Sequence, residues 1–271
     1  MLYLVVPLNI RDFIPPVLFK IRGFAFSKFA VRKSSENKGM QGYEATDLVK
    51  VIVSKNILFR DALELGSPLN LDATRTIIGL SLANLPKGAR VLDFGGGGGT
   101  HYFIANHLFP EKEFKWVVVE TQELCIAAKA LESENLQFIS RVEDVIERHY
   151  EFELAISSCA FQYTPNPLFY LNQILEMRIK KLFFTRNCLT VSNSKIHFKQ
   201  LSKLSSNGPG PLPPGFEDRI VSYPSIFTPL SVFENAIQNH YEIKVKFLED
   251  KGIYNVNGEL INMYGHFCIL K

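Results

Sequence analysis

The sequence predicts an α/β protein with a Rossmann-like, doubly wound sheet that is mostly parallel, preceded by an N-terminal helical extension. Short apolar runs alternate with helical segments over residues 90–185, as in parallel strands that helices cover on both faces. One run leads into five consecutive glycines, Gly95–Gly99, and then a helix. Two strand-like runs near the C-terminus lack a helix between them, which predicts an antiparallel hairpin at one sheet edge.

Composition places the chain among ordinary globular proteins. It has 271 residues, 46% of them hydrophobic and 21% charged, which is enough apolar material for a sizeable core. No window is long and apolar enough for a spanning helix, and the N-terminus does not resemble a signal peptide. The four cysteines form no CxxC pair and the histidines show no ligand spacing, so we expect reduced thiols, a cytoplasmic protein and no metal.

Charge is distributed unevenly along the chain. Residues 1–42 carry seven basic and two acidic residues, a net charge of +5, whereas the remainder carries a net charge of −2. A near-neutral body argues against general nucleic-acid binding. We therefore divide the chain into a basic segment with a linker, residues 1–42, and a main domain, residues 43–271.

The basic segment predicts an amphipathic helix over Phe13–Arg32, opened by Pro15 and Pro16. Two interpretations remain open for residues 14–33. The helix could lie on an anionic membrane surface, at the inner face of the membrane. Alternatively, it packs on the protein's own core while its lysines and arginines reach solvent. Polar residues 33–42 then read as the linker.

A helical lead-in is expected over residues 43–88. Its helices are predicted around Thr46–Ala62 and Leu71–Ala83, with Asn70 or Asp72 as the cap of the second. The turn residues Pro86 to Gly88 end it.

The alternating region predicts five strands and three helices. The strands are expected at Arg90–Phe94, Lys115–Glu120, Leu136–Ile139, Leu154–Ser158 and Lys181–Thr185, and the helices at Thr100–Leu108, Gln122–Leu131 and Pro167–Met177. The terminal hairpin is expected at Tyr241–Leu248 and Tyr264–Leu270, with a turn-rich stretch between them. Residues 207–215, rich in Pro and Gly, predict a surface loop that is either a lid or an ordered excursion.

The glycine run is the strongest motif. It fits neither the G-x-G-x-x-G spacing of dinucleotide-binding folds nor a P-loop, because Thr100 follows and no Gly-Lys-Ser/Thr is present. Asp93 would repel a pyrophosphate but suits a ligand with an ammonium and a sulfonium, namely S-adenosylmethionine. Glu120, at the end of the next strand, can accept hydrogen bonds from ribose hydroxyls. Taken singly, Asp93 could be a turn residue and Glu120 a solvated strand end.

Residues 90–185 resemble the core of class I S-adenosylmethionine-dependent methyltransferases. More narrowly, several stretches resemble a family of methyltransferases often encoded among surface-polysaccharide genes: Gly42-Tyr43, Val91–Phe103, Trp116–Leu124, Leu154–Pro167 and Ser222-Tyr223-Pro224. Two positions depart from these families. Val142 stands where an acid often meets the adenine amine, and Thr185 precedes Arg186 where the narrower family often has an acid.

The resemblance implies a role for each matching residue. Asp93, Gly95 and Gly97 would contact the methionine part of the cofactor, and Glu120 would hold the ribose. Thr121 and Gln122 would lie near the adenine. The full set of expected cofactor-binding residues is Asp93, Gly95, Gly96, Gly97, Thr100, Glu120, Thr121, Gln122, Val142, Ser157 and Ser158.

Catalysis needs a positioned acceptor and, for an oxygen acceptor, a base. Candidates at the carboxyl ends of the strands are His101, Tyr102, Gln162, Tyr163 and Arg186, with Tyr223 as a weaker one. Arg186 could clamp an acidic sugar or phosphate, or simply pair with a surface acid. His101 could equally be a helix residue with no catalytic part.

Together these features predict a methyltransferase that transfers a methyl group from S-adenosylmethionine to an oxygen of a saccharide or a lipid-linked glycan intermediate. The acceptor class follows from the resemblance alone. Two alternatives remain. One is an NAD-dependent sugar oxidoreductase, against which the glycine spacing and Asp93 argue. The other is a non-catalytic binding module on a methyltransferase scaffold, which the lack of an acid at Val142 and of an obvious base leaves open.

Overall fold

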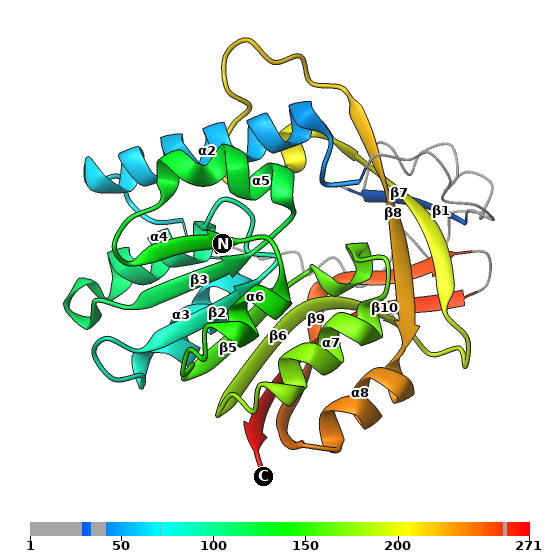
Figure 1. The fold of residues 1–271 in the computed structure, drawn as a ribbon. Coiled ribbons are helices and arrows are strands. Elements are labelled where there is room, and N and C mark those ends of the chain that lie inside the picture. Colours follow the sequence, from blue (N-terminus) through cyan, green and yellow to red (C-terminus); the bar gives the residue numbers. More distant parts are fainter. Residues whose placement is uncertain (1–28, 34–41, 71, 257–258) are drawn as a thin grey trace, which may run out of the picture.

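The computed structural model of the chain describes residues 29–33, 42–70, 72–256 and 259–271. Its centre is a twisted sheet with helices on both faces (Figure 1). This architecture confirms the predicted Rossmann-like α/β fold.

Five parallel strands form the middle of the sheet in the order β4-β3-β2-β5-β6. They are β2 (Arg90–Phe94), β3 (Lys115–Val119), β4 (Leu136–Ile139), β5 (Leu154–Ser158) and β6 (Lys181–Thr190). Three have the predicted bounds, β3 stops one residue early, and β6 runs five residues further. The carboxyl ends of β2, β3, β5 and β6 thus meet at one edge, where open α/β sheets bind ligands.

The C-terminal hairpin extends one edge of this sheet, as predicted. β10 (Glu259–Leu270) lies antiparallel between β6 and β9 (Tyr241–Val256), so β9 runs in the direction of β6. The prediction of a turn-rich stretch between residues 248 and 264 is wrong, because both strands continue through most of it. Cross-strand pairing from Leu248↔Tyr264 out to Val256↔Glu259 overrides the weak strand preference of those residues.

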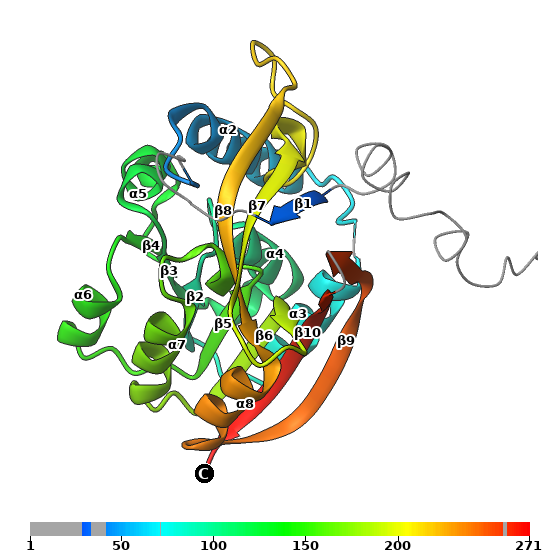
Figure 2. The same cartoon turned by 90° about the vertical axis from the view of Figure 1, so that its right-hand side faces the viewer.

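A second, antiparallel group of strands was not expected. It comprises β1 (Phe29–Lys33), β7 (Ile196–Lys203) and β8 (Ile220–Pro229). The group joins the main sheet where β8 pairs with the end of β6, and its ribbon extends from α8 to a loop beside α2 (Figure 2). The predicted helix over Phe13–Arg32 is wrong at its end, because Phe29–Lys33 pairs with β7 as a strand. The rest of that segment lies outside the described residues.

Seven α-helices cover the two faces in the described part of the chain. One face carries α2 (Thr46–Glu64), α3 (Ala73–Ala83), α4 (Thr100–Leu108) and α5 (Gln122–Ala127); the other carries α6 (Val142–Glu147), α7 (Pro167–Glu176) and α8 (Leu230–Gln238). Short 3₁₀ turns occur at Pro110–Lys112, Ala128–Leu131, Phe161–Tyr163 and Leu204–Ser206. Of the two predicted caps, Asp72 caps α3 by accepting from the Arg75 N–H. No helix of the described ranges has the length and apolarity that crossing a bilayer requires.

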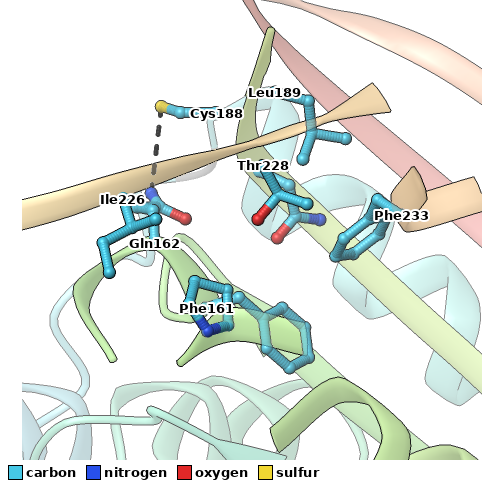
Figure 3. Close-up of a pocket in the computed structure, with 9 residues that line it drawn as sticks. Phe161, Gln162, Cys188, Leu189, Ile226, Thr228 and Phe233 are labelled. Carbon is cyan, nitrogen blue, oxygen red and sulfur yellow. Dashed lines mark hydrogen bonds between the residues drawn. The ribbon is translucent and has the colours of Figure 1, made fainter. Parts of the chain in front are cut away.

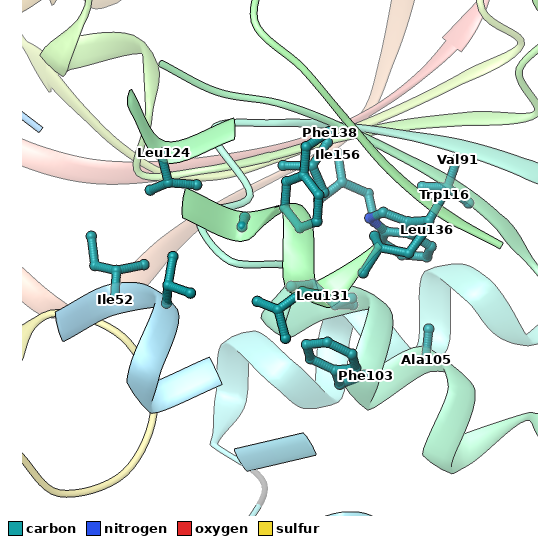
Figure 4. Close-up of a cluster of buried hydrophobic side chains, with 14 of the residues drawn as sticks. Ile52, Val91, Phe103, Ala105, Trp116, Leu124, Leu131, Leu136, Phe138 and Ile156 are labelled. Atoms are coloured by element: carbon teal, nitrogen blue, oxygen red, sulfur yellow. The ribbon is translucent and has the colours of Figure 1, made fainter. Parts of the chain in front are cut away.

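Alternate residues of the central strands belong to two separate hydrophobic clusters, one on each face of the sheet. Val91 and Trp116 belong to the first, which packs against α2, α3, α4 and α5 (Figure 4). Leu92 and Phe94 belong to the second, under α6, α7 and α8. Because side chains alternate along a strand, Asp93 faces the first cluster with Val91. The Asp93 carboxylate therefore lies on the side of the first cluster, next to the glycine loop.

Candidate active site

The glycine run connects β2 to α4 by a loop that other residues cannot form. Gly95, Gly97 and Gly99 have positive φ angles of 72°, 59° and 85°. A Cβ on Gly96 would lie 2.5 Å from the Asp93 carboxyl group, and one on Gly95 would lie 2.1 Å from the Ala160 Cβ. The loop backbone therefore lies directly on its neighbours, and its amides stay close to the crevice at the strand ends.

Asp93 is fully buried beneath this loop. Its carboxylate accepts a hydrogen bond of 3.1 Å from Trp116 Nε1, and His101 Nδ1 lies 3.0 Å from the same oxygen, Oδ2. An ionised carboxylate can only accept, so with Asp93 ionised His101 Nδ1 is the donor of this contact. Asp93 thus joins β2, β3 and α4 at one point and supports the loop. Its direct contact with a methionine group remains a prediction.

Glu120 reaches across from the end of β3 to the glycine loop. Its Oε1 accepts from the Gly97 N–H at 2.9 Å, and its Oε2 accepts from the Thr121 N–H at 3.0 Å. Burial raises the pKa of this carboxyl above its usual value, and the two amide hydrogen bonds offset part of that rise. The structure therefore brings together the loop and the acid that the sequence placed on adjacent strands.

Helix α2 covers the loop from above. The Asn56 side chain is buried; its Oδ1 accepts from the Thr100 hydroxyl at 2.7 Å, and its Nδ2 donates to the Ile52 carbonyl at 2.9 Å. A Cβ on Gly98 would lie within 2.6 Å of this amide. Sequence reasoning missed Asn56, although a polar residue on the apolar face of a predicted helix is a usable signal.

The remaining expected cofactor residues differ in their surroundings. Thr121 caps α5 with its hydroxyl, whereas Gln122 is exposed. Val142 packs in the second hydrophobic cluster, so its side chain turns into the core. Ser157 is fully buried, and its hydroxyl has no hydrogen-bond partner among the described residues, whereas Ser158 is partly exposed.

Two strained residues lie side by side, one just after β5 and one in the middle of β6. Cys159 and Arg186 have positive φ angles of 61° and 57°, which side-chain-bearing residues rarely adopt. The Cys159 N–H donates to the Thr185 carbonyl at 3.0 Å, so the strained positions are adjacent. Arg186 lies in an irregular stretch of the β6–β10 pairing, between Phe184↔His266 and Asn187↔Tyr264. Such irregularities redirect side chains at sheet rims.

Three tyrosine rings pack together beside these strand ends. Tyr43 lies 5.0 Å from Tyr163 and 4.8 Å from Tyr223, between ring centroids. The Tyr163 hydroxyl donates to Gln200 Oε1 at 2.8 Å, and the Tyr223 hydroxyl donates to Asn207 Oδ1 at 3.2 Å. Burial raises the pKa of all three phenols. They are therefore neutral hydrogen-bonding groups at physiological pH.

A small cavity lies behind the strand ends, between η4 (Phe161–Tyr163), β6, β8 and α8 (Figure 3). Its volume of about 10 Å³ is the space that the centre of one water molecule needs. Gln162 Oε1, both side-chain polar atoms of Asn187 and Thr228 Oγ1 are buried there without a partner among the described residues. Gln162 Nε2 donates to Cys159 Sγ at 2.9 Å.

The structure brings most of the candidate catalytic residues together, but not all of them. Gln162, Tyr163, Arg186 and Tyr223 gather around the ends of β5 and β6, and His101 lies against Asp93. Tyr102 instead packs against the rings of Phe103 and Trp116, in the first cluster. The described residues hold no group of three or more His, Cys, Asp or Glu that could bind a metal.

Comparison with known proteins gives structural similarity only. No protein-family model and no curated protein matches the chain. A solved structure of a Burkholderia thailandensis 1,6-didemethyltoxoflavin-N1-methyltransferase is 13% identical, with a TM-score of 0.48 and coverage of 90% of this chain and 96% of that one. An S-adenosylmethionine-dependent methyltransferase from Clostridium acetobutylicum is also 13% identical, with a TM-score of 0.47 and coverage of 80% and 98%.

Proposed function

We propose that this chain is an S-adenosylmethionine-dependent methyltransferase. The observation that carries the proposal is the contact between Glu120 and the Gly97 amide, because it places a carboxylate and a glycine loop face to face across the ends of β2 and β3. That pair is suited to hold a ribose and the chain attached to it.

The residues present fit this cofactor in three respects. The five consecutive glycines carry no side chains, so a ligand can approach the main chain of the loop closely. The fully buried Asp93 lies below the loop and favours a cationic ligand over a pyrophosphate. The Ser157 hydroxyl at the end of β5 is buried without a described partner and is free to bond a ligand.

Each of these residues has a distinct task in the proposal. Glu120 would hold the ribose hydroxyls, the Gly95–Gly97 backbone would line the methionine part, and Ser157 would approach it from β5. Thr121 and Gln122 lie beside the expected adenine position. Bound S-adenosylmethionine supplies a methyl group that its sulfonium already activates, so the protein mainly has to position the acceptor in line with it.

An oxygen acceptor also has to lose a proton, and His101 is the residue best arranged to take it. Asp93 holds its Nδ1, the side chain is 15% exposed, and its Nε2 has no hydrogen-bond partner among the described residues. A carboxylate that orients one ring nitrogen leaves the other available as a base. The buried phenols of Tyr163 and Tyr223 stay protonated and would bind the acceptor instead.

The acceptor we propose is an oxygen of a saccharide or of a lipid-linked glycan intermediate. Its support is the sequence resemblance to the family described above, together with the amide and phenol groups near the ends of β5 and β6, which are typical polar contacts of small-molecule sites. Peripheral membrane contact through the part of residues 14–33 that precedes β1 belongs to the same proposal.

Calorimetry with S-adenosylhomocysteine tests the cofactor assignment. The full chain should bind it, and Glu120→Ala should weaken binding by about 10- to 100-fold, which corresponds to losing hydrogen bonds to a charged group. Glu123→Ala is the matched control, because Glu123 is exposed in the first turn of α5. Absence of binding by the wild type, or equal effects of the two variants, would refute the assignment.

A further inference from the structure

Arg186 stands out among the charged residues near the proposed active site. It lies in the middle of β6, level with the end of β5 and next to Cys159, near the tyrosine cluster. Its backbone has a left-handed φ of 57°, a conformation that must be held in place by its surroundings.

Glu249 of β9 holds this backbone. Its carboxylate accepts from the Arg186 N–H at 3.3 Å and from the Thr185 hydroxyl. The acid thus bonds to the main chain of Arg186, and no hydrogen bond or ion pair joins it to the guanidinium. Glu249 therefore supports the strained backbone of Arg186 and does not pair with the guanidinium of that residue.

The guanidinium is partly buried and has no hydrogen bond or ion pair with any described residue. Of the ionisable groups around it, Cys159 acts on it most, followed by Tyr163, Cys188 and Glu249, and burial keeps Tyr163 and Cys188 protonated. An arginine taken out of bulk water normally pairs with an anion. The Arg186 guanidinium is thus left without a paired anion among the described residues.

We propose that Arg186 binds a carboxylate or phosphate of the methyl acceptor, which makes the acceptor an anionic molecule. This inference rests on the proposed methyltransferase function. Guanidinium forms two parallel hydrogen bonds with either anion, so it can fix the orientation of an acceptor as well as hold it.

Calorimetry of the full chain saturated with S-adenosylhomocysteine tests this inference. The probes are glucuronate, glucose 6-phosphate and uncharged glucose, which separate a carboxylate from a phosphate and both from a neutral sugar. The variants are Arg186→Gln and Arg186→Lys, whose unbranched side chains suit the strained backbone as well as arginine does. Arg148→Gln is the matched control, because it removes the same charge from an exposed residue at the end of α6.

We expect one of the two anions to bind and glucose not to bind. Arg186→Gln should weaken anion binding at least 10-fold, Arg186→Lys should weaken it less, and Arg148→Gln should leave it unchanged. The affinity for S-adenosylhomocysteine should be equal in all four proteins. No saturable binding of either anion, or equal binding by wild type and Arg186→Gln, would overturn the inference.

The same titrations separate this inference from the proposed function. If S-adenosylhomocysteine binds but anion binding is the same with and without Arg186, the acceptor inference fails and the methyltransferase proposal stands. If S-adenosylhomocysteine does not bind, the probes are titrated into the chain alone. If an anion then binds in a way that depends on Arg186, the anion site is confirmed and the proposed methyltransferase reaction is refuted.

Discussion

The Glu120 carboxylate accepts a hydrogen bond of 2.9 Å from the Gly97 amide, 23 residues earlier in the chain. This contact joins the loop after β2 to the end of β3. In the proposed function, a nucleoside would lie beside this contact. The packing around this contact leads to three predictions, and a buried histidine elsewhere in the fold leads to a fourth.

The first prediction concerns Gly96. Its replacement by alanine puts a methyl group 2.5 Å from the Asp93 carboxyl, so the loop must shift. We expect Gly96→Ala to lower the free energy of unfolding by about 1–3 kcal/mol and to weaken S-adenosylhomocysteine binding. Urea unfolding and calorimetry measure the two effects. Gly42→Ala is the control, since its Cβ would meet only Pro224 at 3.9 Å; equal behaviour of the two variants would contradict the packing described.

Trp116 is the subject of the second prediction. Trp116→Phe keeps an aromatic ring but removes the N–H that Asp93 accepts at 3.1 Å. A buried carboxylate that loses a donor should destabilise the fold by about 1–3 kcal/mol. Since Trp116 is the chain's single tryptophan, unfolding should be followed by circular dichroism. Tyr102→Phe, which removes a hydroxyl from a neighbouring ring, should cost much less, and an equal cost would argue against the Asp93 bond.

A third prediction tests how α2 holds the loop. Asn56→Ala removes the bonds to the Thr100 hydroxyl and the Ile52 carbonyl, and it leaves space beside Gly98. We expect a loss of about 1–3 kcal/mol in unfolding free energy. Affinity for S-adenosylhomocysteine should also fall, because the loop loses its cover. Ser54→Ala, two residues away on the same helix, should change neither quantity; unchanged binding in Asn56→Ala would show that α2 does not shape the site.

The fourth prediction concerns pH and His266. Burial lowers the pKa of His266 below 6.5, despite its 2.9 Å hydrogen bond to Glu234. Below about pH 6.5, His266 therefore binds a proton in the unfolded chain more readily than in the folded chain. The free energy of unfolding should consequently fall as the pH drops below about 6.5. His266→Gln should flatten that part of the stability curve. Parallel curves for wild type and His266→Gln would contradict the buried neutral state.

The central strands were predictable from the sequence because both of their faces are buried. Arg90–Phe94 and Leu154–Ser158 are short apolar runs, and the structure gives them the expected bounds. β7 was not predicted for the opposite reason. Two of its inward-facing residues, Gln200 and Ser202, are polar, so the alternation of apolar residues is hidden. In β8, Pro224 is a residue type that disfavours a strand interior.

Part of the candidate site was likewise predictable from the sequence, and part was not. Asp93 and Glu120 could be placed together because parallel strands end at one edge of a sheet. The polar partners that organise the other half of the site, Gln200 and Asn207, come from β7 and the turn after it. Their role depends on a long-range antiparallel pairing that local sequence patterns do not encode. The strained backbone at Arg186 likewise follows from the β6–β10 pairing.

A crystal structure of the full chain with S-adenosylhomocysteine tests the central claim most directly. The account predicts the ligand in the crevice between β2 and β3, with both ribose hydroxyls within hydrogen-bond distance of Glu120 and the methionine part along Gly95–Gly97. A ligand bound elsewhere, or a ribose that does not touch Glu120, would contradict it.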